Sequence, residues 1–486
     1  MSVRRAALWS LVSQYASFAI QFATSVIISR LYLLPADVGL FSIALAAAMM
    51  VSIFQDMGIS RFVTGQPEMR EDHVRDYAAV AVGIGWLVAL AVALAAWPLA
   101  QFYDQPGLTG LMLIIAASYA LSPLAIVPSA LLLRALDLKS LLYANAGSAL
   151  VGGITAVAAA AAGAGPAALA WGMLATALTR LGIVQLLRPV WPRRPRDLTI
   201  VRPMISFGGS SFAISLSGAI GMRSQDLIVG RLLGLTATGL FTRASALAGQ
   251  MSMLVVGSIS GVFYPAFAKK RDAGEDLVEP YLHLVACNTG LQWAAAIGMA
   301  LAAEPLVYLL YGPNWMEVAP LLRWTALAEL FFMAIPLQMD IPILLGRIKT
   351  LVWVNLADTA ITIAILAGFC LWGLEAAAQS RLAAGAIWCA IYAVFISRLL
   401  KLNLASLASV YLRSGLCALA AGVPLLLSRQ LGWFAPDMGF AMLLGLSLAG
   451  VACWFVTLPL VSHPLWREVR LGLSKLSPGR PVGEQA

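Results

Sequence analysis

Two similar stretches of sequence, one in each half of the chain, decide the fold. Residues 25–41 read SVIISRLYLLPADVGLF, and residues 226–241 read DLIVGRLLGLTATGLF. Each has an apolar run, an arginine (Arg30 or Arg231), a short leucine-rich turn and the tripeptide Gly-Leu-Phe. This repeat predicts two lobes of similar topology. Chance similarity between apolar helices is the alternative, and the shared arginine and Gly-Leu-Phe at matching helix ends argue against it.

The rest of the chain is apolar enough to need lipid as its solvent. Hydrophobic residues make up 60% of the 486 residues, charged residues make up 11%, and the mean hydropathy is +0.85. Soluble domains are about 45–50% apolar and about 25% charged. Since a spanning helix takes about 20 apolar residues, the sequence predicts an all-α polytopic membrane protein with about fourteen transmembrane helices. The predicted spans are 7–30, 36–60, 77–100, 109–133, 141–162, 167–188, 204–230, 236–267, 281–303, 317–346, 350–373, 377–398, 408–428 and 437–461.

The basic residues indicate how the chain is oriented in the membrane. The net charge is +9, and the basic residues fall in short segments between apolar runs, which argues against nucleic acid as a partner. With a cytoplasmic N-terminus, most of them lie in inner segments, and the outer loops hold only Arg30, Arg231 and Arg429. The sequence therefore predicts that both termini are cytoplasmic. The apolar stretch after Arg4 and Arg5 is expected to be a retained first span and not a cleaved signal peptide.

The repeat also predicts the domain organisation. Six predicted spans separate its two copies, so both halves are expected to enter the membrane in the same direction. This gives two six-helix lobes, related by a pseudo-two-fold axis along the membrane normal around a central cavity, and two C-terminal helices. Apolar residues at helical spacing after residue 464 predict an amphipathic helix on the inner leaflet. The predicted regions are 1–190 (first lobe), 191–203 (basic cytoplasmic linker), 204–402 (second lobe), 403–461 (helices 13 and 14) and 462–486 (cytoplasmic amphipathic helix and tail).

Motifs for catalysis and metal binding are missing from the sequence. The five cysteines lie in separate apolar runs and the three histidines are scattered, so we expect no metal site and no cofactor. The sequence has no GxxxxGK[ST] motif, and we therefore expect no ATP hydrolysis by this chain. A membrane glycosyltransferase or polysaccharide polymerase is the alternative from another class. It would need acidic residues in a sizeable loop, and the predicted loops are short, so we interpret the chain as a transporter and not an enzyme.

Several stretches resemble one family of transporters. They are Trp9 through Gln14, IISRLYLLPADVGLF (27–41), FQDMGIS (54–60), RSQDLIVGRLLGLTATGLFTRA (223–244), FYPAFAKKRD (263–272) and YGPNWMEVAPLL (311–322). Over residues 1 to about 460 the chain resembles bacterial oligosaccharide and polysaccharide flippases (Wzx-like transporters) of the multidrug/oligosaccharidyl-lipid/polysaccharide exporter superfamily. The resemblance implies alternating-access translocation of polyprenyl-diphosphate-linked oligosaccharide repeat units across the bacterial inner membrane.

The resemblance also implies the partners and the place of the cavity. We expect a lipid-linked oligosaccharide as substrate, membrane lipids around the chain, and a polysaccharide polymerase and glycosyltransferases in the same pathway. The product is exopolysaccharide, capsule or lipopolysaccharide, and the cavity is lined largely by spans 1, 2, 7 and 8. A multidrug or cation antiporter of the same fold would need a carboxylate site in the first lobe, whose spans hold almost none besides Asp56. A flippase of lipid-linked cell-wall precursors is a further alternative.

Arginines within or beside the spans are the predicted substrate-binding residues. A charged residue inside a span costs about 2.5–3.5 kcal/mol, so such residues are informative. Arg223 and Asp226 share one helix face, and Arg243 lies early in the next predicted span. One carboxylate cannot neutralise both arginines, and Arg30 and Arg231 lie at the outer helix ends. Because arginine binds phosphate oxygens in a bidentate manner, we predict that these four arginines form a diphosphate site. A structural ion pair between the lobes is the alternative.

Acidic residues in the spans are the candidates for ion coupling. Asp340 lies between Pro336 and Pro342, which must disturb the helix. A hinge is therefore favoured there over a cation or proton site. Asp358 and Asn355 are expected to bond to sugar hydroxyls or to a neighbouring helix. The acidic cavity residues predicted from the sequence are Asp226, Asp340, Asp358 and Asp56.

Overall fold

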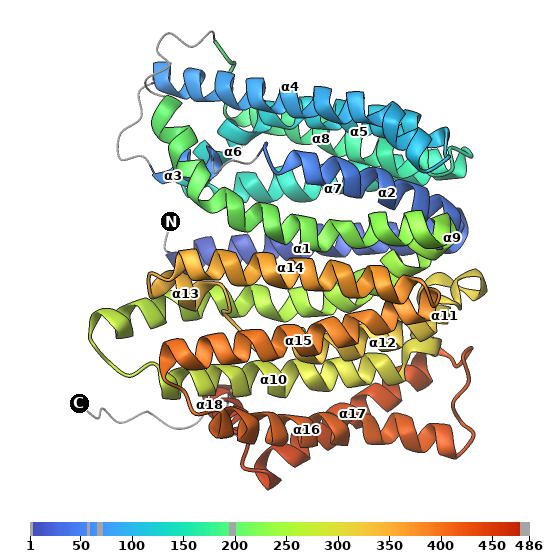
Figure 1. Ribbon diagram of the computed structural model, residues 1–486, viewed down its shortest axis with the longest axis vertical. Helices are drawn as coiled ribbons and strands as arrows, with labels where there is room; N and C mark the ends of the chain where they lie inside the picture. Colours follow the sequence, from blue (N-terminus) through green and yellow to red (C-terminus); the bar gives the residue numbers. More distant parts are fainter. Residues whose placement is uncertain (1–2, 56–58, 66–70, 194–200, 477–486) are drawn as a thin grey trace. The chain divides into compact units, whose positions relative to one another are not determined.

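A computed structural model describes residues 3–55, 59–65, 71–193 and 201–476 (Figure 1). Every regular element in these ranges is a helix, so the predicted all-α class is confirmed for this part of the chain. The chain divides into two compact units, Met1–Thr242 and Arg243–Ala486. The limits of the two predicted lobes, at residues 190 and 204, stay predictions.

The first unit contains eight helices and the first part of a ninth among its described residues. They are α1 (Val3–Leu31), α2 (Pro35–Ser52), α3 (Ile59–Gly65), α4 (Glu71–Phe102), α5 (Gly107–Leu121), α6 (Pro123–Arg134), α7 (Leu138–Ala161), α8 (Ala167–Leu187) and α9 (Val201–Asp272). One of its cores lies where α2, α4, α5 and α8 pack together, around Ile43, Val92 and Ile115. Figure 1 shows α4, α5 and α8 as neighbours within this unit.

The second unit contains the end of α9 and the remaining helices. They are α10 (Val278–Leu301), α11 (Ala303–Tyr311), the 3-10 turn η1 (Pro313–Trp315), α12 (Val318–Phe332), α13 (Asp340–Leu344), α14 (Ile348–Cys370), α15 (Leu374–Leu400), α16 (Leu404–Gln430), α17 (Phe440–Leu460) and α18 (Leu465–Leu476). Helix α10 packs against α12 and α16, and α15 packs against α12 and α14. Helix α18 occupies the segment in which the sequence predicts an amphipathic helix.

The long element α9 is two helices joined at a glycine. Its 72 residues would extend for about 110 Å as one helix, against a hydrocarbon core of about 30 Å. Gly234 interrupts it with φ 88° and ψ −179°, a conformation that an L-residue rarely adopts. The hydroxyl of Thr238 donates to the carbonyl oxygen of Gly234 at 2.9 Å. The break falls between the two predicted spans 204–230 and 236–267.

The predicted number of fourteen spans is not confirmed. Eleven helices in the described residues are long and apolar enough to cross a membrane, or twelve if α5 and α6, which meet at 41°, form one bent span. Two places account for the difference. The seventh and eighth predicted spans lie within α9, and the tenth, 317–346, is interrupted between α12 and α13.

The interruption between α12 and α13 is stabilised by side chains of neighbouring helices. Pro336 lies in this segment and cannot donate to the helix ladder. Asn288 Nδ2 donates to the carbonyl oxygen of Met333 at 2.7 Å, and Tyr281 Oη donates to that of Pro336 at 3.2 Å. Tyr411 Oη donates to a third carbonyl, that of Ala334, at 2.9 Å. Non-helical backbone at membrane depth is tolerated where the protein itself satisfies its polar groups.

The two copies of the sequence repeat are in backbone contact. A Cβ atom on Gly39 would lie 1.9 Å from the carbonyl oxygen of Leu235, and one on Gly239 would lie 1.8 Å from that of Pro35. Glycine is therefore required at both positions. The contact is reciprocal, since each Gly-Leu-Phe glycine packs against the residue four positions before the other. A local two-fold axis between the copies produces contacts of this kind.

Candidate functional site

The predicted site residues Arg223 and Asp226 lie one turn apart on the first segment of α9. Both side chains are half-buried. Asp226 Oδ1 accepts a hydrogen bond of 2.9 Å from the hydroxyl of Thr242. Thr242 lies beyond the break at Gly234, so this bond joins the two segments of α9. Thr242 was not predicted as a site residue, although it directly precedes Arg243 in a stretch that carries the family resemblance.

Arg231 lies at the end of the first segment of α9, beside the end of α4. Its guanidinium carbon is 5.0 Å from the ring centroid of Phe102. The next residue, Tyr103, donates from its hydroxyl to the carbonyl oxygen of Leu227 at 2.9 Å. An arginine over an aromatic ring is attracted by the electron-rich ring face. Arg231 thus keeps an exposed charge near the turn at Gly234.

Arg30, the counterpart of Arg231 in the sequence repeat, lies in the last turn of α1 and is exposed. A cation in the last turn of a helix interacts favourably with the helix dipole. The turn that follows is fixed at the start of α2, where the backbone N–H of Leu34 donates to Asp37 Oδ2 at 3.0 Å. The two repeat arginines therefore lie at corresponding helix ends in different surroundings.

Arg243 lies on the second segment of α9, in the second unit. Its guanidinium carbon is 5.9 Å from the ring centroids of both Tyr311 and Trp315. These two rings are almost fully buried, and their centroids are 5.7 Å apart. An aromatic ring stabilises a cation without cancelling its net charge. The two rings thus hold the guanidinium of Arg243 in place.

The two rings around Arg243 were not predicted from the sequence, although they lie in a stretch that carries the family resemblance. That stretch is Tyr311-Gly-Pro-Asn-Trp315, in which α11 ends and η1 begins. Gly312 has φ 83°, which lets the chain reverse so that both rings reach the same side. The sequence feature that could have indicated these rings is a pair of aromatic residues flanking a Gly-Pro turn.

Other charged residues of the second unit form ion pairs with one another. Arg323 Nη2 lies 2.9 Å from Glu304 Oε1, and Arg381 Nη2 lies 3.2 Å from Glu329 Oε1. Glu329 is buried, so its pairing with Arg381 offsets the cost of removing the carboxylate from water. We assign these pairs to helix packing and not to the site.

The predicted acidic residues are dispersed over several elements. Asp340 is the first residue of α13 and is half-buried. Asp358 lies in the middle of α14, three residues after the buried Asn355. Asn355 Nδ2 and Asp358 Oδ1 have no hydrogen-bond partner within the described part of the chain. Asp56 lies outside the described residues. No metal-binding group of three His, Cys, Asp or Glu side chains occurs in the residues that the structure describes.

Solved structures with the same fold are membrane transporters. The chain superposes on the lipid II flippase MurJ, in its inward closed conformation, with a TM-score of 0.73 and 13% identity over 95% of this chain and 99% of that one. A multidrug resistance MATE family transporter of the MOP superfamily, in an inward-facing conformation, gives a TM-score of 0.58 with 15% identity over 81% and 99%. The protein is therefore a multi-pass membrane protein with a MurJ/MATE-like transporter fold.

The chain belongs to the family described as "Polysaccharide biosynthesis protein", which matches residues 27–320. It is 24% identical over 321 residues to the succinoglycan biosynthesis transport protein ExoT of Rhizobium meliloti. It is also 24% identical over 299 residues to the lipopolysaccharide biosynthesis protein WzxC of Escherichia coli. These alignments cover 66% and 59% of this chain, and they span 65% and 58% of the relatives' own length. The resemblance drawn from the sequence is confirmed.

Proposed function

We propose that this chain is a flippase of the bacterial inner membrane. It translocates polyprenyl-diphosphate-linked oligosaccharide repeat units by alternating access, for exopolysaccharide, capsule or lipopolysaccharide assembly. The observation that carries the proposal is a fold shared with a lipid II flippase over 95% of the chain, in a polysaccharide biosynthesis family. Two relatives are named for succinoglycan transport and lipopolysaccharide biosynthesis, which supports the choice of substrate class.

The energetics of the substrate explain why such a protein is needed. Each hydroxyl transferred into hydrocarbon without a partner costs a few kcal/mol, about 4–8 on a cyclohexane scale, so an oligosaccharide cannot cross a bilayer unaided. A polar cavity removes this cost while the prenyl chain stays in lipid. A membrane potential of about 100 mV, inside negative, favours outward movement of about two negative charges by about 4–5 kcal/mol. Because the membrane potential already favours export, coupling of transport to an ion is not required on this ground.

The proposed diphosphate site consists of Arg223 and Arg243, with Arg30 and Arg231 at helix ends. The contacts of Arg243 with Tyr311 and Trp315 support this role, because the rings fix the guanidinium and leave its charge in place. The hydrogen bond from Thr242 also fixes the carboxylate of Asp226, which lies one turn from Arg223. For the acidic residues we propose a secondary role: Asp226, Asp340, Asp358 and Asp56 bind sugar hydroxyls or a coupling ion.

Export assays on three variants test the diphosphate site. Arg243→Ala should abolish polysaccharide export in a strain that lacks the chromosomal gene, while the protein still inserts. Arg243→Lys should restore export only in part, because lysine offers a point charge without the two-pronged donor. The double variant Arg243→Ala, Asp226→Ala is the control. Recovery of export in the double variant, at matched protein levels, would mean that Arg243 serves only as an ion-pair partner.

A multidrug or cation antiporter is the second candidate, because the MATE transporter shares the fold at a lower TM-score. The two candidates differ in what accumulates when the gene is deleted. A flippase deletion should leave lipid-linked oligosaccharide in the inner leaflet with unchanged sensitivity to toxic cations. Increased cation sensitivity with normal lipid-linked oligosaccharide would favour the antiporter.

We also propose cytoplasmic termini and a pathway that includes a polymerase and glycosyltransferases. The distribution of basic residues supports the orientation. A membrane-impermeant thiol reagent should label Gln105→Cys only from outside the cell and Lys139→Cys only after the inner face is opened. The reverse pattern would invert the proposed topology.

A further inference from the structure

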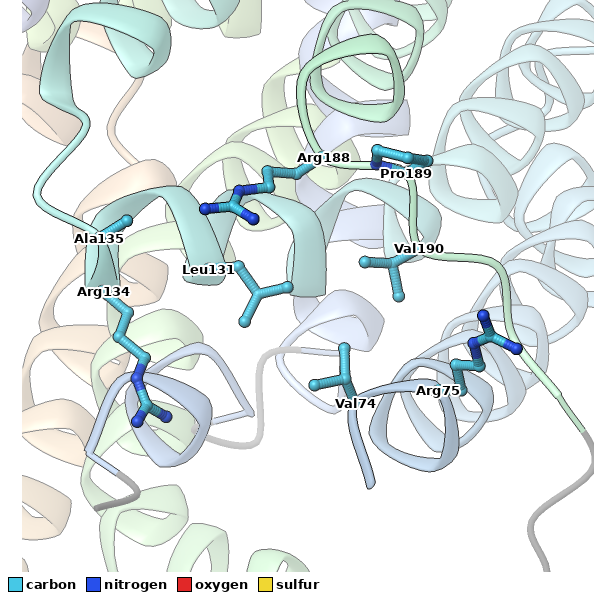
Figure 2. A pocket seen from close by; sticks show the side chains of 8 residues that line it. All are labelled: Val74, Arg75, Leu131, Arg134, Ala135, Arg188, Pro189 and Val190. Atoms are coloured by element: carbon cyan, nitrogen blue, oxygen red, sulfur yellow. The ribbon is translucent and has the colours of Figure 1, made fainter. Parts of the chain in front are cut away.

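The first unit contains a cavity of about 580 Å³ (Figure 2), and none of the residues that line it belongs to the predicted diphosphate site. It is formed by the start of α4, the end of α6 and the turn after α8, and we call it the α4–α6–α8 pocket. Its lining residues are Val74, Arg75, Leu131, Arg134, Ala135, Arg188, Pro189 and Val190. Figure 2 shows the three arginines spaced around the cavity, with Leu131, Val74 and Val190 between them. Pockets of about 300–1,000 Å³ are typical of small-molecule sites.

The turn that carries Arg188 is held in one conformation by Gln185. The side-chain amide of Gln185 donates to the carbonyl oxygens of Val190 at 2.9 Å and Leu124 at 3.2 Å. Its side-chain oxygen accepts from the backbone N–H of Val190 at 2.9 Å. Val190 is buried in the core that includes Phe62 and Tyr77. The pocket is thus a preformed feature.

The charges around the pocket have the same sign. The side chains of Arg75 and Arg188 make no hydrogen bond or ion pair with any residue that the structure describes, and no described residue that lines the cavity is acidic. Helix dipoles explain why a cation would lie at the ends of α6 and α8, where Arg134 and Arg188 are found. They do not explain the position of Arg75, which lies near the start of α4, because the helix dipole does not stabilise a cation there. An anion bound in the cavity would offset the electrostatic repulsion among Arg75, Arg134 and Arg188.

The surroundings of the pocket are apolar. Leu186 and Trp191, on either side of the turn that carries Arg188, are 86% and 65% exposed. Leu133 and Leu136, at the end of α6, are also exposed. Tryptophan is enriched at the membrane–water interface, and the pocket arginines lie in segments predicted to be cytoplasmic. An occupant that joins a phosphate to a hydrocarbon chain fits both the arginines and these apolar side chains.

We propose that the α4–α6–α8 pocket binds the phosphate-bearing head of a membrane lipid, with Arg75, Arg134 and Arg188 as its ligands. Basic pockets between transmembrane helices on the cytoplasmic side bind anionic lipid head groups in this way. Two sources supply the same chemistry: an anionic phospholipid of the bilayer and a prenyl diphosphate. The proposal does not rest on the transport activity proposed above, because it concerns binding alone.

Binding of defined lipids to the purified full-length protein tests the proposal. Phosphatidylglycerol, farnesyl diphosphate, diacylglycerol and inorganic phosphate are titrated in detergent, with native mass spectrometry to count bound molecules. The wild type should bind at least one of the two lipid phosphates, and diacylglycerol should not bind. The variant Arg75→Gln, Arg134→Gln, Arg188→Gln should bind that lipid at least tenfold more weakly. The matched control removes three exposed cations outside the pocket, as Arg347→Gln, Lys349→Gln, Arg398→Gln, and should bind as the wild type does.

The outcomes separate the sources and leave the proposal open to refutation. Tighter binding of phosphatidylglycerol identifies a bilayer lipid, and tighter binding of farnesyl diphosphate identifies a prenyl carrier. Equal binding by the wild type and the pocket variant overturns the proposal, and so does an equal loss in the control variant. Displacement of the lipid by inorganic phosphate at the same concentration overturns the lipid assignment. If the pocket variant does not fold, Leu131→Glu places an acid in the cavity instead, and unchanged binding by it overturns the proposal.

Discussion

Two pockets of this protein are each lined by three arginines, and their surroundings differ. The α4–α6–α8 pocket belongs to the first unit. The second pocket, of about 710 Å³, belongs to the second unit, and we call it the α10–α16–α18 pocket. Its lining residues are Glu279, Leu282, His283, Val410, Arg413, Pro459, Ser462, His463, Pro464, Trp466, Arg467 and Arg470. It therefore contains an acid and two imidazoles as well as the arginines.

Several charged or titratable side chains of the α10–α16–α18 pocket have partners within the protein. Arg413 Nη1 donates to the carbonyl oxygen of Ser462 at 3.3 Å, and Arg470 lies 5.7 Å from the ring centroid of Trp466. His283 Nε2 lies 3.2 Å from Glu468 Oε1 on α18. The His283–Glu468 contact attaches the amphipathic helix α18 to α10, and the Arg413 bond attaches α16 to the turn before α18. Two of the three arginines of this pocket, Arg413 and Arg470, thus have contacts within the protein, whereas the side chains of Arg75 and Arg188 in the other pocket have no partner among the described residues.

The largest effect that we expect in this comparison comes from His463, which is buried beside the second pocket. Burial, with smaller effects of Arg413 and His283, lowers the pKa of His463 to about 4. An unfolded histidine has a pKa of about 6.5, so the folded protein binds fewer protons between these values. The stabilisation is complete above about pH 6.5 and is lost as the pH falls toward 4. We expect the free energy of unfolding to fall by up to about 3 kcal/mol over this range.

Thermal unfolding in nanodiscs from pH 7.5 to pH 4.5 measures this effect. The hydrogen bond between His463 Nε2 and Ser414 Oγ is 3.0 Å long, so the neutral imidazole is built into the packing of α16. His463→Gln should be less stable than the wild type at pH 7.5 and should show a smaller loss on acidification. His73→Gln is the matched control and should follow the wild type. An identical pH dependence in His463→Gln and the wild type would contradict the prediction.

The sequence predicts the class of fold well because apolar run length and repeat motifs are local signals. The glycines Gly39 and Gly239 were visible as a repeat, and the structure shows them in reciprocal backbone contact. The break at Gly234 falls between two predicted spans. The interruption at Pro336 changed the count of spans, because it depends on side chains such as Asn288 that lie far away in the sequence.

The candidate site could be predicted only in part, because its geometry depends on contacts between distant segments. Arg243 was selected as an unusual charge in an apolar run, but its aromatic neighbours Tyr311 and Trp315 come from another helix. The α4–α6–α8 pocket was not predicted. Arg75, Arg134 and Arg188 each appear in the sequence as ordinary loop cations, and only the folded chain brings them around one cavity.

A second prediction concerns the turn that shapes the α4–α6–α8 pocket. Gln185→Leu removes two hydrogen bonds to Val190 and one to Leu124, and it leaves these backbone groups to be satisfied by water. Three lost bonds at about 0.5–1.5 kcal/mol net each amount to about 1.5–4.5 kcal/mol. Because water replaces part of this bonding, we expect a loss of about 1–3 kcal/mol in stability. We also expect lipid phosphate to bind about tenfold more weakly, because Arg188 loses its fixed position.

The control for Gln185→Leu is Gln430→Leu, at the exposed end of α16. It makes the same chemical change away from both pockets and should alter neither stability nor lipid binding. Thermal unfolding and the lipid titration measure the two effects separately. Normal lipid binding by a destabilised Gln185→Leu protein would show that the turn need not be fixed for the arginines to act.

The smallest effect should come from making the second pocket resemble the first. Glu279→Gln and Glu468→Gln remove acids from the α10–α16–α18 pocket and from α18 while the side chains keep their size. The His283–Glu468 pair is partly exposed, so its loss should cost less than about 1 kcal/mol in stability. A charge near an anionic lipid surface is worth about 1 kcal/mol, so each change should strengthen binding of phosphatidylglycerol about fivefold. Lipid binding is measured in the single and double variants, with Glu375→Gln as an exposed control. This measurement tests whether the acidic residues account for the difference in lipid binding between the two pockets. Unchanged binding in the double variant would mean that shape, and not charge balance, distinguishes the two.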